Sequence, residues 1–145
     1  MSYPTRAFEG RMGGGAHAIQ GNGSACPTNP TCGGILAFRN STMRLGSGNI
    51  SGNQGSGIAV GQLVDFGLSN TTISNNTGDG VHIQRISVGD FVAANTITGN
   101  GGASVSCDTT SLATGDLSTF SNISCSRIDR AVGPQRPGNP KQPNP

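Results

Sequence analysis

Four polar residues have the types and spacing of a ligand-binding face. His82 and Gln84 alternate with apolar residues, as in a strand with one buried side, so both side chains are expected on the outer side of that strand. Arg85 follows at the end of the strand, and Asp108 lies one repeat further along the chain than Gln84. Such a face could bind the hydroxyl groups or the carboxylate of a sugar, with Arg85 as the partner of the anion. The alternative is that the four are solvated side chains on a sheet surface.

The cysteines favour disulfides over a metal site. Cys26 and Cys32 bracket a short loop that contains two prolines, and Cys107 and Cys125 make a second possible pair. None of the four forms a CxxC motif and the chain has only 2 histidines, so no metal site is expected. The state of the second pair stays open, because Cys107 as a free thiol also fits a buried apolar position.

Disulfides are typical of proteins outside the reducing cytosol. The N-terminal residues lack the apolar segment of a cleavable signal peptide, and no segment is apolar over the roughly 18 residues that span a bilayer. We expect a secreted or cell-surface protein with no membrane span in this chain and an export signal upstream of it. The alternative is a reduced intracellular chain.

The composition is typical of strands and turns. Gly occupies 24 of the 145 positions, and Gly, Ser, Asn and Thr together fill nearly half of the chain, whereas Lys and Glu, which usually cover helix surfaces, occur once each. Hydrophobic residues make up 32%, which suits a narrow core wrapped by many turns. The arginines are scattered and aromatic residues make up 4%, so nucleic acid is not an expected partner.

An isoleucine recurs along the chain with a nearly constant period, which lengthens slightly at the last interval. Its members are Ile50, Ile73, Ile97 and Ile123. A further apolar position follows each of the first three at a fixed offset, and a third apolar patch closes each unit, held by Leu68 and Val92 and less clearly by Leu117 or Phe120. A unit of this length with three short strands predicts one coil of a solenoid, in which each strand pairs in parallel with its counterpart about 4.8 Å along the axis.

An asparagine stands three residues after each of the first three isoleucines. These residues are Asn53, Asn76 and Asn100. We expect them at sharp bends, because asparagine tolerates the left-handed conformation. Their stacked amides would then bond to one another from coil to coil as a structural ladder.

The repeat resembles that of the right-handed parallel β-helix family, which includes pectate-lyase-like and NosD-like proteins. The resemblance rests on the phrase Ile-x-x-Asn-x-Gly-x-x-Ile/Val within residues 49–60, 72–83 and 95–105. It implies an all-β, right-handed parallel β-helix of about four to five coils with a period of 23 to 24 residues. We expect this domain over residues 17–126, with a disulfide-closed loop inserted near 24–32, an irregular N-terminal segment at 1–16 and a Pro-rich tail at 127–145.

Enzymes of the resembled family cut acidic polysaccharides. The lyases use acidic residues that hold Ca²⁺ and an Arg or Lys as the base, and the hydrolases use clustered aspartates. This chain has no Asp-Asp pair. We therefore expect a non-catalytic segment without a cofactor, serving as a scaffold or as a saccharide-binding face. The alternative is part of a polysaccharide lyase or glycoside hydrolase, with Asp79, Arg85 and Asp108 as candidate catalytic residues and Ca²⁺ under the lyase reading alone.

A solenoid of this length needs cover at its two ends, where strand edges are open. We expect flanking sequence, self-association or the N-terminal segment to supply it.

Overall fold

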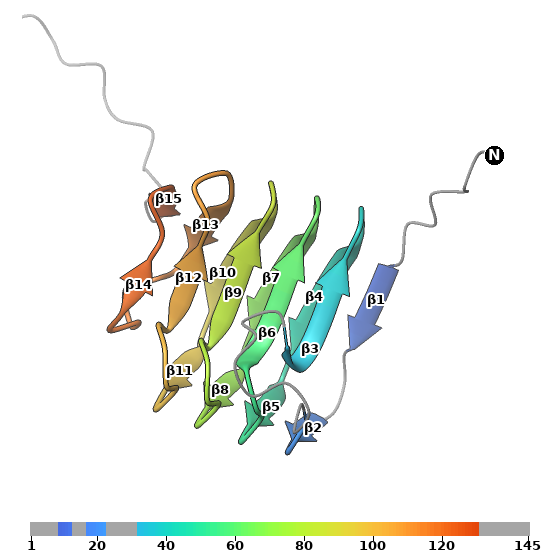
Figure 1. The fold of residues 1–145 in the computed structure, drawn as a ribbon, viewed down its shortest axis with the longest axis vertical. Coiled ribbons are helices and arrows are strands. Elements are labelled where there is room, and N and C mark those ends of the chain that lie inside the picture. The colour runs from blue at the N-terminus through green and yellow to red at the C-terminus, as the bar shows by residue number, and fades with distance from the viewer. Residues whose placement is uncertain (1–8, 13–16, 23–31, 131–145) are drawn as a thin grey trace, which may run out of the picture.

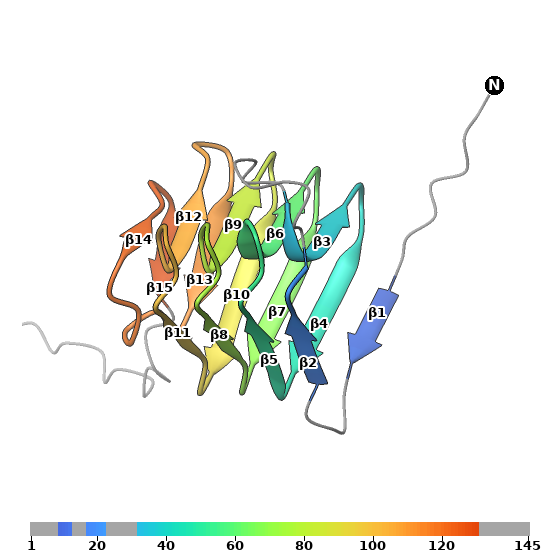
Figure 2. The same ribbon diagram turned by 60° about the horizontal axis from the view of Figure 1, so that its bottom comes forward.

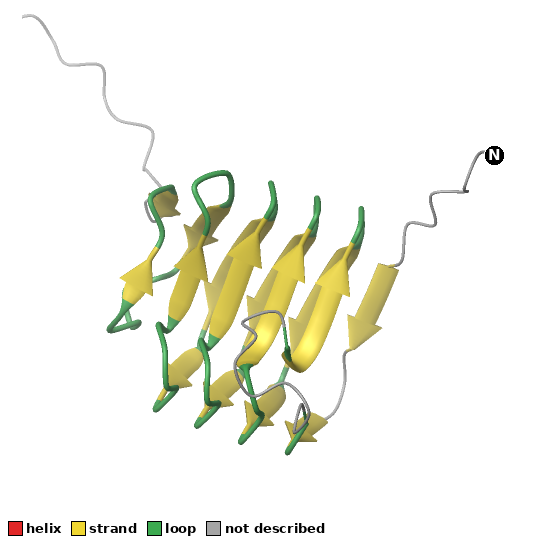
Figure 3. Ribbon diagram, in the orientation of Figure 1, coloured by secondary structure: helices red, strands yellow, loops and turns green. Residues whose placement is uncertain are grey.

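The chain folds into short strands joined by tight turns (Figure 1). A computed structural model describes residues 9–12, 17–22 and 32–130, and no helix occurs among them (Figure 3). The strands are β1 (Glu9–Met12), β2 (His17–Gln20), β3 (Gly33–Phe38), β4 (Thr42–Gly46), β5 (Gly48–Ser51), β6 (Ser56–Gly61), β7 (Asp65–Ser69), β8 (Thr72–Ser74), β9 (Val81–Gln84), β10 (Val88–Ala93), β11 (Thr96–Thr98), β12 (Val105–Cys107), β13 (Leu112–Gly115), β14 (Ile123–Ser124) and β15 (Ile128–Arg130). The predicted all-β fold is confirmed.

The strands form three parallel sheets around one core (Figure 2). Sheet A has the order β1-β4-β7-β10-β13-β15, sheet B the order β2-β5-β8-β11, and sheet C the order β3-β6-β9-β12-β14. Consecutive strands always belong to different sheets, so the chain winds around the core and returns to each sheet once per coil. Four coils, which begin at β2, β5, β8 and β11, contribute one strand to every sheet. The molecule is a parallel β-solenoid, as predicted.

The register of the middle coils matches the predicted period. Ile50 lies beside Ile73 in sheet B, and Ile73 lies beside Ile97. Residues one period apart in the sequence are therefore neighbours in the sheet. Their side chains are at most 4% exposed, so each column of the repeat is one line of the core.

A stack of aromatic rings fills the centre of the core. Phe91 makes edge-to-face contacts with Phe66 and Phe120, at ring-centroid distances of 5.7 and 5.3 Å. The sequence pattern assigned the inward position of β10 to Val92, and this assignment was wrong: Phe91 lies opposite Leu68 and is fully buried, whereas Val92 is 58% exposed. Side chains alternate along the strand, so Val92 points outward after inward Phe91, and the register then shifts between Phe91 and Ala93.

Asn53, Asn76 and Asn100 form a ladder of hydrogen bonds between coils. Asn53 Nδ2 donates to Asn76 Oδ1 at 2.8 Å, and Asn76 Nδ2 donates to Asn100 Oδ1 at 2.9 Å. The expected left-handed backbone is not at these residues. It lies at the residue before each of them, at Gly52 (φ 64°), Asn75 (φ 54°) and Gly99 (φ 65°). That residue makes the bend, and the asparagine after it turns its amide toward the core.

The two ends differ from the expected domain boundaries. β1 lies within the segment expected to be irregular and pairs with β4, and β15 lies within the expected tail and pairs with β13. Ile123 was expected to begin a coil beside Ile97, but it pairs with Val105 in sheet C. The last coil is therefore shorter than the others, and a turn that buries Leu117 and Phe120 takes the place of a strand in sheet B.

A disulfide ties the last coil to the one before it. Cys107 of β12 is bonded to Cys125, which directly follows β14, so the question left open by the sequence is answered in favour of the bridge. The described part of the chain holds no free cysteine. Cys26 and most of the predicted 24–32 insertion lie outside the described residues, as does most of the predicted tail.

Candidate functional site

β9 places His82 and Gln84 on the outer side of sheet C. The apolar residues that alternate with them are fully buried, whereas both polar residues are partly exposed. His82 lies beside Ser106 in the sheet register. The backbone N–H of Asp108 donates to the carbonyl of Ile83 at 3.0 Å, which brings Asp108 to the end of β9. The candidate face therefore spans two neighbouring coils.

His82 belongs to a polar cluster with Asp79 and Ser106. Ser106 Oγ donates to Asp79 Oδ2 at 2.5 Å, while His82 Nδ1 lies 2.8 Å from Ser106 Oγ and 3.3 Å from Asp79 Oδ2. Because Ser106 donates its proton to Asp79, its oxygen accepts the proton on Nδ1. This network assigns Nε2 as the unprotonated nitrogen of the neutral imidazole.

The cluster lacks the geometry of a nucleophilic triad. In such a triad the imidazole stands between the serine and the carboxylate and uses a different ring nitrogen for each. Here Ser106 and Asp79 both meet Nδ1, so His82 cannot take a proton from Ser106 through its basic nitrogen. Nε2 is the ring nitrogen available to act on a ligand.

The carboxylate of Asp79 also holds the turn between two coils. Its Oδ1 accepts the backbone N–H of Ala103 at 2.8 Å. Burial raises the pKa of Asp79, but hydrogen bonds from His82, Ser106 and Ala103 outweigh it and lower the pKa from the ordinary 3.8. Asp79 is therefore an anion at neutral pH that stabilises the fold and the polar cluster together.

Asp108 is fully engaged with neighbouring turns. Its Oδ2 accepts the backbone N–H of Arg85 at 2.6 Å, and its Oδ1 accepts both the backbone N–H and the hydroxyl of Thr110, at 3.0 and 2.9 Å. Desolvation raises the pKa of Asp108, but these bonds and one from Ser111 outweigh it and lower the pKa to about 2. The carboxylate fixes the turn at Arg85 rather than remaining open to a ligand.

The Asp108 carboxylate gives the fold a pH dependence. Its pKa falls from 3.8 to about 2 on folding, so its stabilisation is present above pH 3.8 and is lost as the pH falls toward 2. We expect Asp108→Ala to lower the free energy of unfolding at neutral pH and to flatten its decline over this acidic range. Urea unfolding at a series of pH values measures both effects. The neighbouring Thr109→Ala keeps the carboxylate and should follow the wild-type curve, whereas an Asp108→Ala curve parallel to wild type would contradict the assignment.

Phe38 adds an aromatic ring to the outer side of sheet C. The residue is partly exposed and aligns with Gly61, which in turn aligns with Gln84. A Cβ on Gly61 would lie 2.9 Å from the Phe38 ring and 3.0 Å from Gln84 Cγ, so the glycine leaves the space in which the two side chains meet. Gln84 Nε2 is buried and has no hydrogen-bond partner among the described residues.

Arg85 stands exposed at the end of this row. Its backbone adopts the left-handed conformation (φ 57°) and donates to Asp108, and its guanidinium forms no ion pair within the described residues. The structure thus brings Gln84, Arg85 and Asp108 together, but it engages Asp108 through the Arg85 backbone rather than through the guanidinium.

The donor set at this face does not fit Ca²⁺. The ion takes six to eight oxygen ligands. The carboxylate oxygens of Asp79 and Asp108 already accept hydrogen bonds from N–H and O–H donors. No group of three or more His, Cys, Asp or Glu residues gathers within the described ranges. Nor do these ranges include a helix with the length and apolar character to cross a membrane.

The sequence analysis missed two features of the face. It did not group Asp79 with His82 and Ser106, although the period of the repeat already places His82 beside Ser106. It also missed Phe38, although Phe38 lies one period before Gly61 and so shares its outward column. Both signals were present in the repeat.

No curated protein and no solved structure matches the chain. The family described as right handed beta helix region matches residues 18–132, which include the candidate face and nearly all of the four complete coils. The parallel three-sheet solenoid and this match agree, and the chain belongs to the right-handed β-helix family.

Proposed function

We propose that this chain is a non-catalytic β-helix segment of a secreted or cell-surface protein and that it binds saccharide on the outer side of sheet C. The observation that carries the proposal is the row formed by Phe38, Gly61 and Gln84, with Arg85 beside it. Partly exposed Phe38 offers an apolar surface to a sugar, and the exposed guanidinium of Arg85 offers donors to its hydroxyl or carboxylate groups.

Two further observations support this reading. The carboxylates of Asp79 and Asp108 bind backbone N–H groups of neighbouring turns, a role in holding the scaffold rather than in catalysis. The Cys107–Cys125 disulfide is typical of proteins in oxidising compartments, which supports secretion or display at the cell surface.

The test is retention of the purified chain on immobilised neutral and acidic polysaccharides. We expect Phe38→Ala to weaken binding roughly tenfold, since it removes the stacking surface. Arg85→Asn removes the guanidinium, keeps a residue that tolerates the left-handed backbone, and should weaken binding to acidic polysaccharides alone. Thr96→Ala on sheet B is the control and should bind as wild type does. Absence of retention, or retention that neither variant changes, would refute the proposal.

One observation favours a second candidate, an enzyme acting on acidic polysaccharide. His82 presents Nε2 as a potential general base, and its Nδ1 is fixed by Ser106 and Asp79. A base at this position could remove a ring proton from a uronate while the glycosidic C–O bond breaks. The departing oxygen takes a proton from water, and an unsaturated uronate remains as the other product. Absorbance of that product, present with the wild-type chain and lost with His82→Ala, would identify a lyase. Retention without absorbance favours the binding role.

A further inference from the structure

The two ends of the solenoid leave strand edges without a partner in the described chain. β1 and β15 are the two edge strands of sheet A and lie at opposite ends of the stack of coils (Figure 1). Sheet C ends in the same way at β3 and β14. An open edge presents a row of N–H and C=O groups on which another chain can pair.

Apolar side chains are also less covered at the ends than in the middle. Inward residues of the middle coils such as Ile58 and Ile73 are fully buried, whereas Ile35 and Ile123 are only partly buried and Ile128 is 36% exposed. Ile35 and Ile123 occupy the first and last places of one inward column of sheet C. A further coil at either end would cover them.

The register of sheet A identifies what fits against these edges. One column of the register runs through Arg11, Arg44, Gly67, Asp90, Thr114 and Asp129, so its residues are basic at the N-terminal end and acidic at the C-terminal end. If the β1 edge of a second copy continued the sheet beyond β15, Asp129 would lie opposite Arg11 of that copy. Arg127, two residues earlier, would lie opposite its Glu9.

The charges select this register over its neighbours. A shift by two residues in one direction would set Asp129 against Glu9, and a shift in the other direction would set Arg127 against Arg11. Like charges directly opposite destabilise a strand pair, and a shift by a single residue would turn the apolar side of the strand outward. The in-line register makes both charged pairs attractive.

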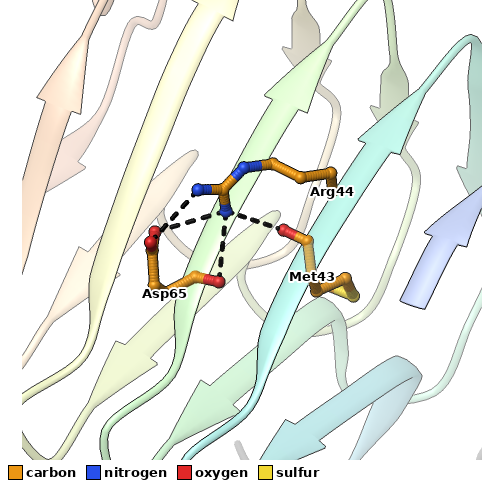
Figure 4. Close-up of polar contacts among 3 residues, drawn as sticks. All are labelled: Met43, Arg44 and Asp65. Carbon is orange, nitrogen blue, oxygen red and sulfur yellow. Dashed lines mark hydrogen bonds and ion pairs between the residues drawn. The ribbon is translucent and has the colours of Figure 1, made fainter. Parts of the chain in front are cut away.

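Sheet A already uses an arginine–carboxylate pair between adjacent coils. Arg44 of β4 binds the carboxylate of Asp65 in β7, with Nη2 3.1 Å from Oδ2, and also donates to the backbone carbonyls of Asp65 and Met43 (Figure 4). The stem of Arg44 lies over Gly67, which has no side chain to displace it. The same surface can therefore hold such a pair across a junction between copies.

We propose that this chain binds a second copy of itself head to tail, with β15 of one copy pairing in parallel with β1 of the next. Each copy uses two different surfaces, so the contact is heterologous and repeats into open chains of solenoids. This inference is independent of saccharide binding, because it uses the ends of sheet A and not the outer side of sheet C.

Sedimentation velocity of the full, disulfide-intact chain over a range of concentrations tests the proposal. We expect the wild-type chain to associate with rising concentration. Asp129→Arg and Arg11→Asp should each weaken association roughly tenfold, because each replaces an attractive pair by a repulsive one. Asp90→Arg makes the same charge change in the same column, but in a middle coil, and should associate as wild type does. Thermal unfolding by circular dichroism verifies that each variant is folded.

Mixing the two end variants gives the sharper measurement. Each alone places like charges at the junction, whereas a junction between Asp129→Arg and Arg11→Asp chains again joins opposite charges. We expect the mixture to associate at concentrations at which each variant alone is monomeric. A wild-type chain that stays monomeric throughout would overturn the proposal, and so would variants that associate like wild type or a mixture that does not associate.

Discussion

We expect Asn76→Ala to lower the free energy of unfolding by about 3–4 kcal/mol. The Asn76 amide accepts hydrogen bonds from the backbone and side chain of Asn53 and donates to the Ile50 carbonyl and to Asn100. The residue is 2% exposed, so water does not replace these bonds when the amide is removed. Several donors and acceptors in the two adjacent coils then lose their partner at once. Urea unfolding followed by far-UV circular dichroism measures the loss.

Asn75→Gly is the matched control for this prediction. Asn75 is the preceding residue in the same bend, is exposed, and has a φ of 54°, which glycine adopts freely. We expect this variant to lose less than about 1 kcal/mol, which is the range of a glycine substitution outside the core. Equal losses in the two variants would contradict a stabilising role for the ladder amide.

Phe91→Ala should lower the free energy of unfolding by about 3–5 kcal/mol. The ring is fully buried and lies between Phe66 and Phe120, so the substitution leaves a cavity in the middle of the stack and removes two edge-to-face contacts. Because Phe120 belongs to the turn that covers the last coil, we also expect that coil to loosen. Hydrogen exchange of the amides of β14 and β15 would register this as faster exchange.

The neighbouring Val92→Ala distinguishes the two faces of β10. Val92 is 58% exposed, so its truncation should cost less than about 1 kcal/mol. A larger loss for Val92→Ala than for Phe91→Ala would mean that the strand has the opposite register. The pair therefore checks directly the point at which the sequence pattern and the structure differ.

The period of the middle coils could be predicted because each column repeats one residue type. Ile50, Ile73 and Ile97 share an environment in three successive coils, and their spacing in the sequence is the length of one circuit of the chain. Parallel in-register stacking makes sequence distance and spatial position equivalent. The resemblance to the β-helix family rested on these columns and is confirmed by the family match.

The ends of the solenoid could not be predicted in the same way. Ile123 continues the isoleucine series after a slightly longer interval, but in the folded chain it lies beside Val105 of sheet C. The last coil has no following coil whose matching residues would stack on it and keep the period. Its path is set instead by the contact of Phe120 with Phe91 and by the Cys107–Cys125 disulfide. These contacts are specific to the end and have no counterpart in the repeat.

The candidate face was predicted in position but not in its contacts. The alternation around His82 and Gln84 is visible in the sequence, as is the spacing from Gln84 to Asp108. The hydrogen-bond partners of these residues are not visible in the sequence. The oxygen that a side chain contacts depends on its rotamer and on the path of the neighbouring turn. Asp108 binds the Arg85 backbone and Asp79 binds Ser106, and each bond joins residues of two different coils.

The sequence by itself determined the class of fold, the length of the coil and most of the residues that line the core, because residues one period apart in the sequence become neighbours in a solenoid. Only the tertiary structure decided which glycine or asparagine makes each bend, how the last coil ends, and which carboxylates hold the scaffold. Those outcomes depend on a balance of buried hydrogen bonds and ring contacts across neighbouring coils. These hydrogen bonds and ring contacts join residues of different coils, so they form only when the coils are stacked and cannot be predicted from one repeat alone.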